Sequence, residues 1–420
     1  MRKGQEPVNP SGTSRYALTF IFITMLIDTI GLGIIIPVLP DIIARLTHQG
    51  LSGAAQWGGW LFFAYAGTQF LCAPLIGNLS DRFGRRPLLI GSLAMLGVDY
   101  VLTGLAPTIW WMFAGRLLSG MAGARYTTAN AFIADVSPPE KRAANFGLIG
   151  AAFGVGFILG PGIGGFVGEH FGLSAPFFVS AGLAFANALF GLFVLKESLP
   201  PERRRKFEWW RANPLGALKA LSRFPALTGL FAVLALAQFA HDSLPSTWTY
   251  YTMLKFGWGP GDVAWSLVAV GALTTISFGV LPRLLVPRIG EKRTVYLGLA
   301  CGAISYAGYA FAGQVWVFYS WMLVFTLGGV ANPALNAIMS RDVPADEQGE
   351  LQGTSSSITS LTSVAALLAM PNLFGWFTGP HAPVYFPGAA FLAAGLCELG
   401  ALTIFAITAR ARQRLMSGSA

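Results

Sequence analysis

Six ionisable side chains stand inside otherwise apolar runs of this sequence. They are Asp28, Asp99, Arg116, Arg125, Asp242 and Glu398. A charge at membrane depth is costly, so an ionisable residue in such a run is a functional candidate. A carboxylate that gains and loses a proton could couple proton flow to the movement of another solute. We therefore expect proton coupling to involve Asp28, Asp99, Arg116, Asp242 and Glu398.

The positions of these residues also predict ion pairs. Asp99 precedes the end of its run by about as many residues as Arg116 follows the start of the next, so the two should lie at similar depth. Asp28 and Arg125 both lie near the middle of their runs. Asp28 either takes part in coupling or substrate binding, or forms a permanent ion pair with Arg116 or Arg125. Arg116 is expected to tune the proton affinity of the coupling acid.

The two acids of the second half are harder to assign. Asp242 follows His241 near the outer end of the seventh run, so it either titrates in function or lies in the wet mouth of a cavity. Glu398 stands near the middle of the last run. Trp248 either stacks on an aromatic substrate or anchors the chain at the membrane interface. The predicted substrate-binding residues are Asp28, Arg125, Tyr126, Asn130, Gln238, Asn332 and Asn336.

The elements that must position these residues are membrane spans. Hydrophobic residues make up 54% of the 420, charged residues only 11%, and the mean hydropathy is +0.57. A soluble domain carries about 25% charge, so the composition indicates a multi-pass membrane protein. The net charge of +9 comes from basic residues in short loops, which topology explains better than nucleic-acid binding.

Twelve apolar runs are each long enough to cross a bilayer, which predicts an all-α membrane protein. The predicted spans are 16–39, 56–77, 87–106, 109–134, 143–168, 174–195, 225–247, 261–286, 293–312, 315–340, 350–375 and 386–409. The loops on the side of the N-terminus carry most of the Lys and Arg, whereas those on the other side carry only Arg45 and Lys255. This asymmetry predicts that both termini are cytoplasmic.

The densest cluster of charge lies between the second and third runs, and part of it recurs later in the chain. The predicted gating loop consists of Gly77, Asp81, Arg82, Gly84, Arg85 and Arg86. A weaker copy surrounds Gly290, 206 residues after Gly84, with Pro287 in the position of Asp81. This spacing predicts two six-helix repeats: an N-terminal bundle at 1–195, a cytoplasmic linker at 196–224 and a C-terminal bundle at 225–420.

The fifth run is rich in glycine at spacings that suit close helix packing. Its predicted packing residues are Gly150, Gly154, Gly160, Pro161 and Gly164. Small residues four apart form a smooth face on which another helix can close. Pro161 removes a backbone hydrogen bond and permits a bend.

Together, these motifs resemble the major facilitator superfamily. Residues 77–86 are similar to its loop signature, 116–120 to its fourth-helix motif and 150–165 to the motif that marks its exporters. The stretches 28–40, 98–100, 131–135, 333–341, 348–353 and 361–363 narrow the resemblance to the bacterial tetracycline/proton antiporters. The resemblance implies proton-coupled export of a small amphiphilic drug by alternating access, from a bacterial inner membrane.

The sequence departs from those antiporters at three places. They carry an Asp in the ninth helix where Gly302 stands here, and a His in the eighth where Thr274 stands. They carry small residues where Arg125 and Tyr126 stand here. Asp242 or Glu398 could replace the missing acid, and we expect weak or absent activity on tetracycline itself.

Two alternatives to drug export remain open at this point. One is a major facilitator transporter for a metabolite or other non-drug solute. The other is an intramembrane enzyme or a channel, but the sequence has no nucleophile paired with a base, no metal-ligand cluster and no Gly-x-x-x-x-Gly-Lys-[Ser/Thr] loop. We therefore expect a small-molecule substrate, protons and the lipid bilayer as partners, with no cofactor, metal, nucleotide or nucleic acid.

Overall fold

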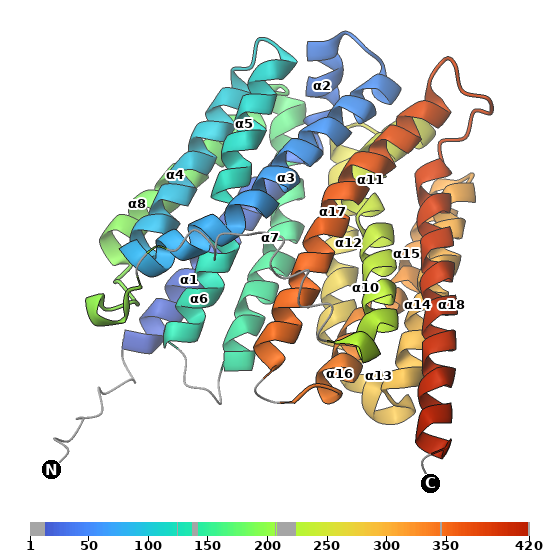
Figure 1. Ribbon diagram of the computed structural model, residues 1–420. Helices are drawn as coiled ribbons and strands as arrows, with labels where there is room; N and C mark the ends of the chain where they lie inside the picture. Colours follow the sequence, from blue (N-terminus) through green and yellow to red (C-terminus); the bar gives the residue numbers. More distant parts are fainter. Residues whose placement is uncertain are drawn as a thin grey trace, which may run out of the picture.

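A computed structural model shows a bundle of long helices that cross it from end to end (Figure 1). It describes residues 13–418 apart from 124, 137–141, 206, 208–223 and 345–346. The first helix begins and the last helix ends at the same end of the bundle, which we call the terminal end. The other end is called the opposite end.

Helices α1 to α8 form one half of the chain and α10 to α18 the other. The first half contains α1 (Thr13–Ile35), α2 (Leu39–Thr47), α3 (Leu51–Phe83), α4 (Arg85–Gly104), α5 (Ile109–Ala122), α6 (Arg125–Val136), α7 (Arg142–Phe171) and α8 (Ala175–Val194). The second half contains α10 (Thr228–His241), α11 (Ser243–Phe256), α12 (Pro260–Gly279), α13 (Leu281–Ile289), α14 (Glu291–Phe311), α15 (Val315–Gly328), α16 (Ala331–Arg341), α17 (Gln348–Thr378) and α18 (Ala389–Gly418). The described residues between the halves contain two short 3₁₀ segments, Pro201–Arg203 and Pro225–Leu227.

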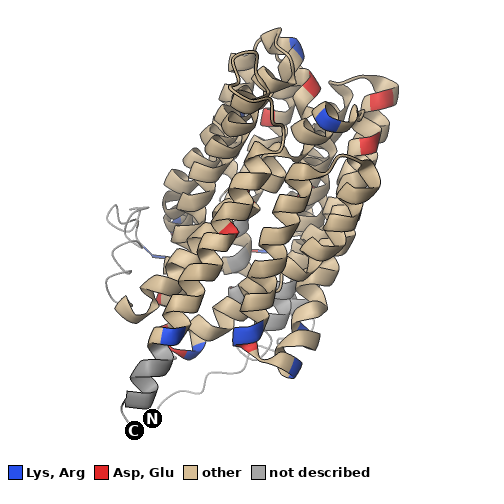
Figure 2. Cartoon of the chain, turned by 90° about the vertical axis from the view of Figure 1, so that its right-hand side faces the viewer, with Lys and Arg blue, Asp and Glu red and all other residues tan. Residues whose placement is uncertain are grey.

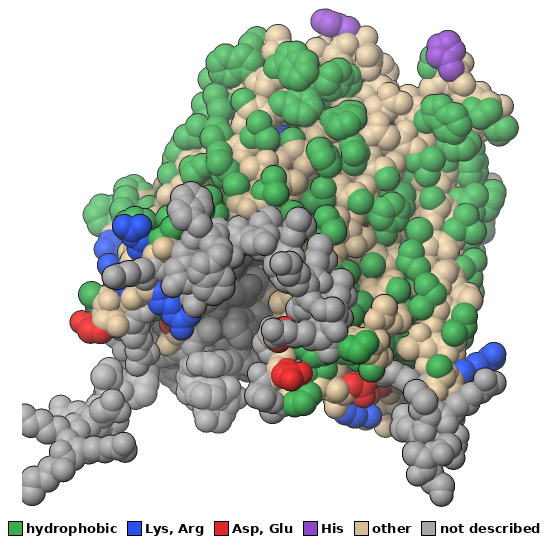
Figure 3. Space-filling model, viewed as in Figure 1, with side chains coloured by type: hydrophobic (Ala, Val, Ile, Leu, Met, Phe, Trp, Pro, Cys, Tyr) green, Lys and Arg blue, Asp and Glu red, His purple; other side chains and the backbone are tan. Residues whose placement is uncertain are grey.

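The helices confirm the predicted all-α membrane fold. Eleven helices within the described residues are long and apolar enough to span a membrane. The remaining predicted span, 109–134, consists of α5 and α6, which lie on either side of the undescribed residue 124. Hydrophobic side chains are spread over much of the face of the bundle that Figure 3 shows. Phe193 and Trp265 are among the most exposed, as expected of side chains that face lipid.

The two halves repeat the same helix boundaries 206 residues apart. Helix α4 begins after Gly84 and α14 after Gly290, and both glycines have positive φ, 105° and 80°. An L side chain rarely adopts that backbone conformation, so glycine suits both positions. Likewise, α1 ends at Ile35 and α10 at His241. These shared boundaries are those expected of a duplicated chain.

Charged residues gather toward the two ends of the bundle, and few lie between (Figure 2). The terminal end carries Arg82, Arg86 and Arg288 at or beside helix ends. The opposite end carries Arg45 and Lys255 in the last turns of α2 and α11. In helical membrane proteins, Lys and Arg are typically concentrated in the loops on one side of the membrane and are rare on the other side.

Helices α3 and α7 join the two halves. Helix α3 packs mainly on α17 and also on α11, and helix α7 packs on α12. Near the opposite end the Ser52 hydroxyl donates to the carbonyl oxygen of Thr378 at 3.0 Å. Across the other pair the backbone N–H of Gly261 donates to the Glu169 carboxylate at 3.0 Å. These contacts close the seam between the halves at the opposite end.

The glycines of α7 face two different helices. A Cβ at Gly160 would lie 2.7 Å from a carbonyl oxygen of α1 and one at Gly164 would overlap another, whereas one at Gly154 would lie 2.9 Å from Thr275 of α12. A Cβ at Gly150 would meet no described atom within 4 Å. The predicted smooth face is therefore divided between α1 and α12, and Gly150 does not belong to it. Helix α7 continues through Pro161.

The prediction for Trp248 was wrong in both of its forms. Trp248 is 3% exposed, and its Nε1–H donates to the Ser266 hydroxyl at 3.0 Å. Its ring packs with Tyr309, Phe318 and Phe391 in the core of the second half. It therefore neither faces a substrate nor anchors the membrane interface.

Candidate functional site: buried ionisable groups and a charged cluster

An ion pair inside the first half joins α4 to α5. The Arg116 guanidinium donates to Asp99 Oδ2 at 2.5 Å, and the Thr103 hydroxyl donates to Oδ1 at 3.2 Å. Asp99 is fully buried. The prediction that Asp99 and Arg116 lie at similar depth is confirmed by their ion pair. Gly115 makes room for the pair, because a Cβ there would overlap Asp99 Oδ1.

Asp28 lies on α1 and is 4% exposed. Helix α1 packs on α6, which carries three predicted substrate-binding residues, Arg125, Tyr126 and Asn130. Their side chains lie outside the described part of the chain. Arg116 forms its ion pair with Asp99. The structure therefore does not support the alternative of a permanent ion pair between Arg116 and Asp28.

Asp242 lies at the junction between α10 and α11 and is 7% exposed. The Gln238 amide donates to both of its carboxylate oxygens, at 3.0 and 3.1 Å, and to the Ser363 hydroxyl of α17 at 3.2 Å. The seventh span runs to Phe256, so Asp242 lies near its middle. Its expected position near the outer end, in a wet cavity mouth, was wrong because the predicted span ended too early, at 247.

Glu398 lies on the face of α18 that packs against α14. Its carboxyl carbon would be 3.3 Å from a Cβ at position 302, so the absence of a side chain at Gly302 makes room for the acid. Gly302 stands where the resemblance places an Asp in other exporters. Here a carboxylate from a different helix occupies the neighbourhood of that position.

The remaining predicted substrate residues lie on α16. The Asn336 amide donates to the Asn332 side-chain oxygen at 2.7 Å, one helical turn away. Asn332 is exposed and Asn336 is partly exposed. The structure thus brings these two residues together on α16.

The predicted gating loop is in fact a helix–glycine–helix turn. Asp81 and Arg82 belong to the last turn of α3, Gly84 lies between the helices, and Arg85 begins α4. Arg82 lies over the Phe83 ring, 5.0 Å from its centroid. The positive φ of Gly84, 105°, lets the chain turn between the two helices.

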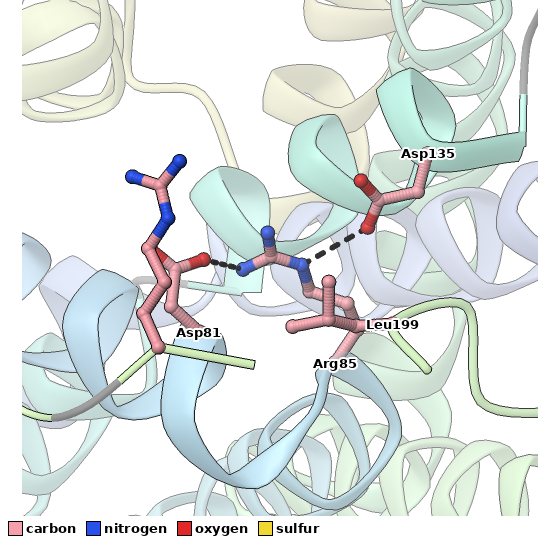
Figure 4. Close-up of a pocket in the computed structure, with 5 residues that line it drawn as sticks. Asp81, Arg85, Asp135 and Leu199 are labelled. Carbon is pink, nitrogen blue, oxygen red and sulfur yellow. Dashed lines mark hydrogen bonds and ion pairs between the residues drawn. The ribbon is translucent and has the colours of Figure 1, made fainter. Parts of the chain in front are cut away.

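Arg85 is the centre of a charged cluster beside this turn (Figure 4). It pairs with Asp81 at 2.6 Å and with Asp135 of α6 at 3.2 Å. Its guanidinium also donates to the Ser80 hydroxyl at 3.0 Å. A pocket of about 540 Å³ lies at this place at the terminal end. Its lining consists of Asp81, Arg85, Asp135, Leu199 and Arg205.

Glu197 is a residue of this cluster that the sequence reasoning missed. Its carboxylate accepts hydrogen bonds from the backbone N–H groups of Arg85 and Arg86, at 2.8 and 3.2 Å. It therefore caps the positive end of α4. A Cβ at Gly84 would overlap the Glu197 carboxylate. This close contact is a second reason, besides the positive φ, why glycine suits this position. The sequence feature that could have indicated this role is the position of Glu197, an acid directly after the sixth predicted span.

The second half carries a pair at the same place with the charges exchanged. Glu291 begins α14 as Arg85 begins α4, and it pairs with Arg341 at the end of α16. Arg85 pairs with Asp135 near the end of α6. The contact between these helices is thus kept in both repeats, with opposite polarity.

The described residues contain no group of three or more His, Cys, Asp and Glu side chains that could hold a metal ion. What they do contain is buried carboxylates within membrane-spanning helices. Such groups can exchange protons and bind polar parts of a solute. Together with the duplicated helical bundle, they define a membrane transporter.

The comparisons with known proteins agree with this class. The chain belongs to the Major Facilitator Superfamily, whose family model matches residues 21–367. It is 36% identical over 365 residues to the class C tetracycline resistance protein of Escherichia coli, covering 86% of this chain and 90% of the relative. It is 30% identical over 352 residues to multidrug resistance protein 2 of Bacillus subtilis, covering 83% and 85%.

Solved structures show the same fold. The human organic anion transporter MFSD10 (TETRAN) superimposes with a TM-score of 0.70 at 22% identity, covering 96% of this chain and all of that one. The nucleoside transporter NupG superimposes with a TM-score of 0.72 at 13% identity, covering 94% and 99%. At these identities the likeness concerns the fold alone.

Proposed function

We propose that this chain exports a small amphiphilic drug across a bacterial inner membrane in exchange for protons. The observation that carries the proposal is the similarity to tetracycline and multidrug resistance proteins, which extends over 86% and 83% of this chain. Buried acids in both halves supply groups that could bind and release the proton. Both termini face the cytoplasm in this proposal, because the terminal end carries the basic helix ends.

The two halves, 1–195 and 225–420, would rock about a central substrate site with 196–224 as the linker. The seam of α3 with α17 and α7 with α12 is closed at the opposite end, which corresponds to a site that opens to the cytoplasm. Asp28, Gln238 and the α6 residues Arg125, Tyr126 and Asn130 are proposed to bind the substrate. Asn332 and Asn336 would line the same site from α16.

Transport into everted membrane vesicles tests this function. A panel that includes tetracycline and ethidium is offered to vesicles energised by an electron donor, with empty-vector vesicles as the control. We expect uptake of at least one compound that collapses when nigericin dissipates the pH gradient. Energised vesicles that accumulate none of the panel, with no effect of nigericin, would contradict drug–proton exchange.

The same panel decides the preference among drugs. We expect uptake of tetracycline to be weak, because Gly302 and Thr274 replace ionisable residues of the exporters that the sequence resembles. Strong tetracycline uptake that survives both Glu398→Gln and Asp242→Asn would show this expectation to be wrong.

A further inference from the structure

A second pocket at the terminal end is lined by three arginines and one aromatic ring. It has a volume of about 440 Å³, and its lining consists of Arg82, Arg204, Arg205 and Phe207. Arg82 belongs to the last turn of α3, whereas the other three residues belong to the chain that follows α8. The pocket therefore lies between the end of α3 and the beginning of the segment that connects the halves. We call it the basic pocket.

Within the described part of the chain, the three guanidinium groups of the basic pocket form no ion pair with an acid. Glu197 is close by, since a Cβ at Gly84 would overlap its carboxylate and lie 3.2 Å from Arg204 Nη2. However, both Glu197 oxygens already accept backbone hydrogen bonds, from the first two residues of α4 and from Leu199. The basic pocket therefore carries an excess of positive charge.

The segment that carries Arg204 and Arg205 is held against α3. The backbone N–H of Arg205 donates to the carbonyl oxygen of Asp81 at 3.0 Å. Arg205 also lines the neighbouring pocket, but the Asp81 carboxylate there is paired with Arg85 at 2.6 Å. This backbone contact keeps like charges near one another, although they repel. An anion bound between the arginines would relieve that repulsion.

The basic pocket also lies beside a surface that suits acyl chains. Phe83, directly after Arg82, is 50% exposed, and Phe193 near the end of α8 is 82% exposed. The Arg86 guanidinium donates to the carbonyl oxygen of Leu192 at 2.6 Å, so the start of α4 and the end of α8 lie side by side. Basic side chains lie next to hydrophobic ones at the lower left of Figure 3. Cations and exposed aromatic rings at the end of membrane spans are typical of the headgroup level.

We propose that the basic pocket binds the phosphate group of an anionic phospholipid of the phosphatidylglycerol type. Guanidinium groups suit this ligand because their planar N–H fork matches two phosphate oxygens. The glycerol part of the lipid contacts Phe207, and the acyl chains lie along the exposed rings of Phe83 and Phe193. The bound lipid holds the segment after α8 on the end of α3. This inference does not depend on which solute the protein exports.

Native mass spectrometry of the purified full-length protein in detergent tests the ligand. The protein is titrated with phosphatidylglycerol, phosphatidylcholine and sn-glycerol 3-phosphate. Phosphatidylglycerol is expected to bind at least about tenfold more tightly than phosphatidylcholine, whose choline group cancels the phosphate charge. Equal binding of the two lipids would overturn the proposal. Binding of sn-glycerol 3-phosphate as tight as that of phosphatidylglycerol would show a site for a soluble phosphate and would overturn the assignment to a lipid.

Substitution of the arginines tests the place of binding. Each basic side chain near a membrane surface strengthens the attraction of anionic lipid by about fivefold. Arg204→Gln alone is therefore expected to weaken binding of phosphatidylglycerol about fivefold, and the triple variant Arg82→Gln/Arg204→Gln/Arg205→Gln at least about tenfold. All three side chains are exposed, so these variants should fold. Binding by the triple variant at the wild-type affinity would overturn the proposal.

A matched triple variant controls for net charge. It loses three exposed arginines on either side of Gly290, at the equivalent turn of the second repeat, through Arg283→Gln, Arg288→Gln and Arg293→Gln. Its affinity for phosphatidylglycerol is expected to stay within about twofold of the wild type. Thermal unfolding gives a second readout, because a ligand of the folded state raises the unfolding temperature of the wild type and of this control but not of the pocket variant. Equal weakening in the two triple variants would show a general attraction to net charge and would overturn the site.

Discussion

The Glu169 carboxylate at the end of α7 accepts a hydrogen bond from the backbone N–H of Gly261 in the first turn of α12. The first turn of a helix has unsatisfied N–H groups and a positive dipole end, so a carboxylate there is stabilising. Because α7 and α12 belong to different halves, this contact holds the opposite end closed. It must break whenever the seam opens at that end.

Replacing Glu169 with Gln is expected to favour the conformation that is open at the opposite end. The amide keeps an acceptor oxygen but loses the charge, so about 0.3–1 kcal/mol of stabilisation is lost, which shifts the equilibrium about two- to fivefold. Spin labels on α2 and on the loop between α17 and α18 would report a larger share of long distances. The three native cysteines must first be replaced by Ser. An unchanged distance distribution would show that Glu169 does not hold this seam.

Because Asp99 and Arg116 form an ion pair, we expect Asp99→Asn and Arg116→Gln to have non-additive effects on the free energy of unfolding. Asp99→Asn leaves the half-buried Arg116 charge unpaired and should lower the free energy of unfolding by about 3–5 kcal/mol, because broken buried ion pairs are costly. Adding Arg116→Gln should restore part of that loss. Thermal unfolding in detergent of the two single variants and the double variant measures the coupling. Additive effects would contradict a direct pair.

Asp81→Asn is expected to reduce transport several-fold while membrane levels stay normal. The amide would leave Arg85 paired with Asp135 alone, so the end of α3 would be held less firmly against α6. The matched control is Pro287→Ala, since Pro287 stands in the position of Asp81 in the second repeat. Uptake by Asp81→Asn at the wild-type rate would remove its role in the gate.

The two ends of the α7 glycine series should respond differently to one methyl group. Gly164→Ala would place a Cβ in overlap with the Ile34 oxygen, and relief of that overlap is expected to cost about 1–3 kcal/mol. Gly150→Ala meets open space and serves as the control. Unfolding temperatures in detergent give the comparison. Equal stability of the two variants would contradict the close contact of α7 with α1.

Asp41 in α2 provides a prediction about pH. Burial raises the pKa of the Asp41 carboxyl above its ordinary value. The folded protein therefore binds this proton more tightly than the unfolded chain, so its contribution to stability rises as the pH falls through the folded pKa. Asp41→Asn should raise the unfolding temperature at about pH 7 and lose that advantage near about pH 4. A variant less stable than wild type at neutral pH would show that the charged form is favoured instead.

Local properties of the chain were enough to predict the spans, the repeated boundaries and the Gly84 turn. The length of an apolar run determines whether a helix can cross a membrane. The ability of glycine to adopt positive φ is a property of the residue itself and does not depend on which residues pack against it. The similar depth of Asp99 and Arg116 also follows from counting residues along two consecutive helices, since the rise per residue is constant.

Only the tertiary structure decided which side chains from distant segments meet. The Glu398 carboxyl group lies against Gly302 of α14, and Glu197 caps α4, because of the rotation and tilt of packed helices. Hydropathy does not encode those angles. Asp242 was misplaced for a related reason: polar residues in α11 ended the apolar run, but they are buried within the second half, where their hydroxyl groups are satisfied by backbone oxygens. Burial inside a helical bundle depends on neighbouring helices, which a single apolar run does not reveal.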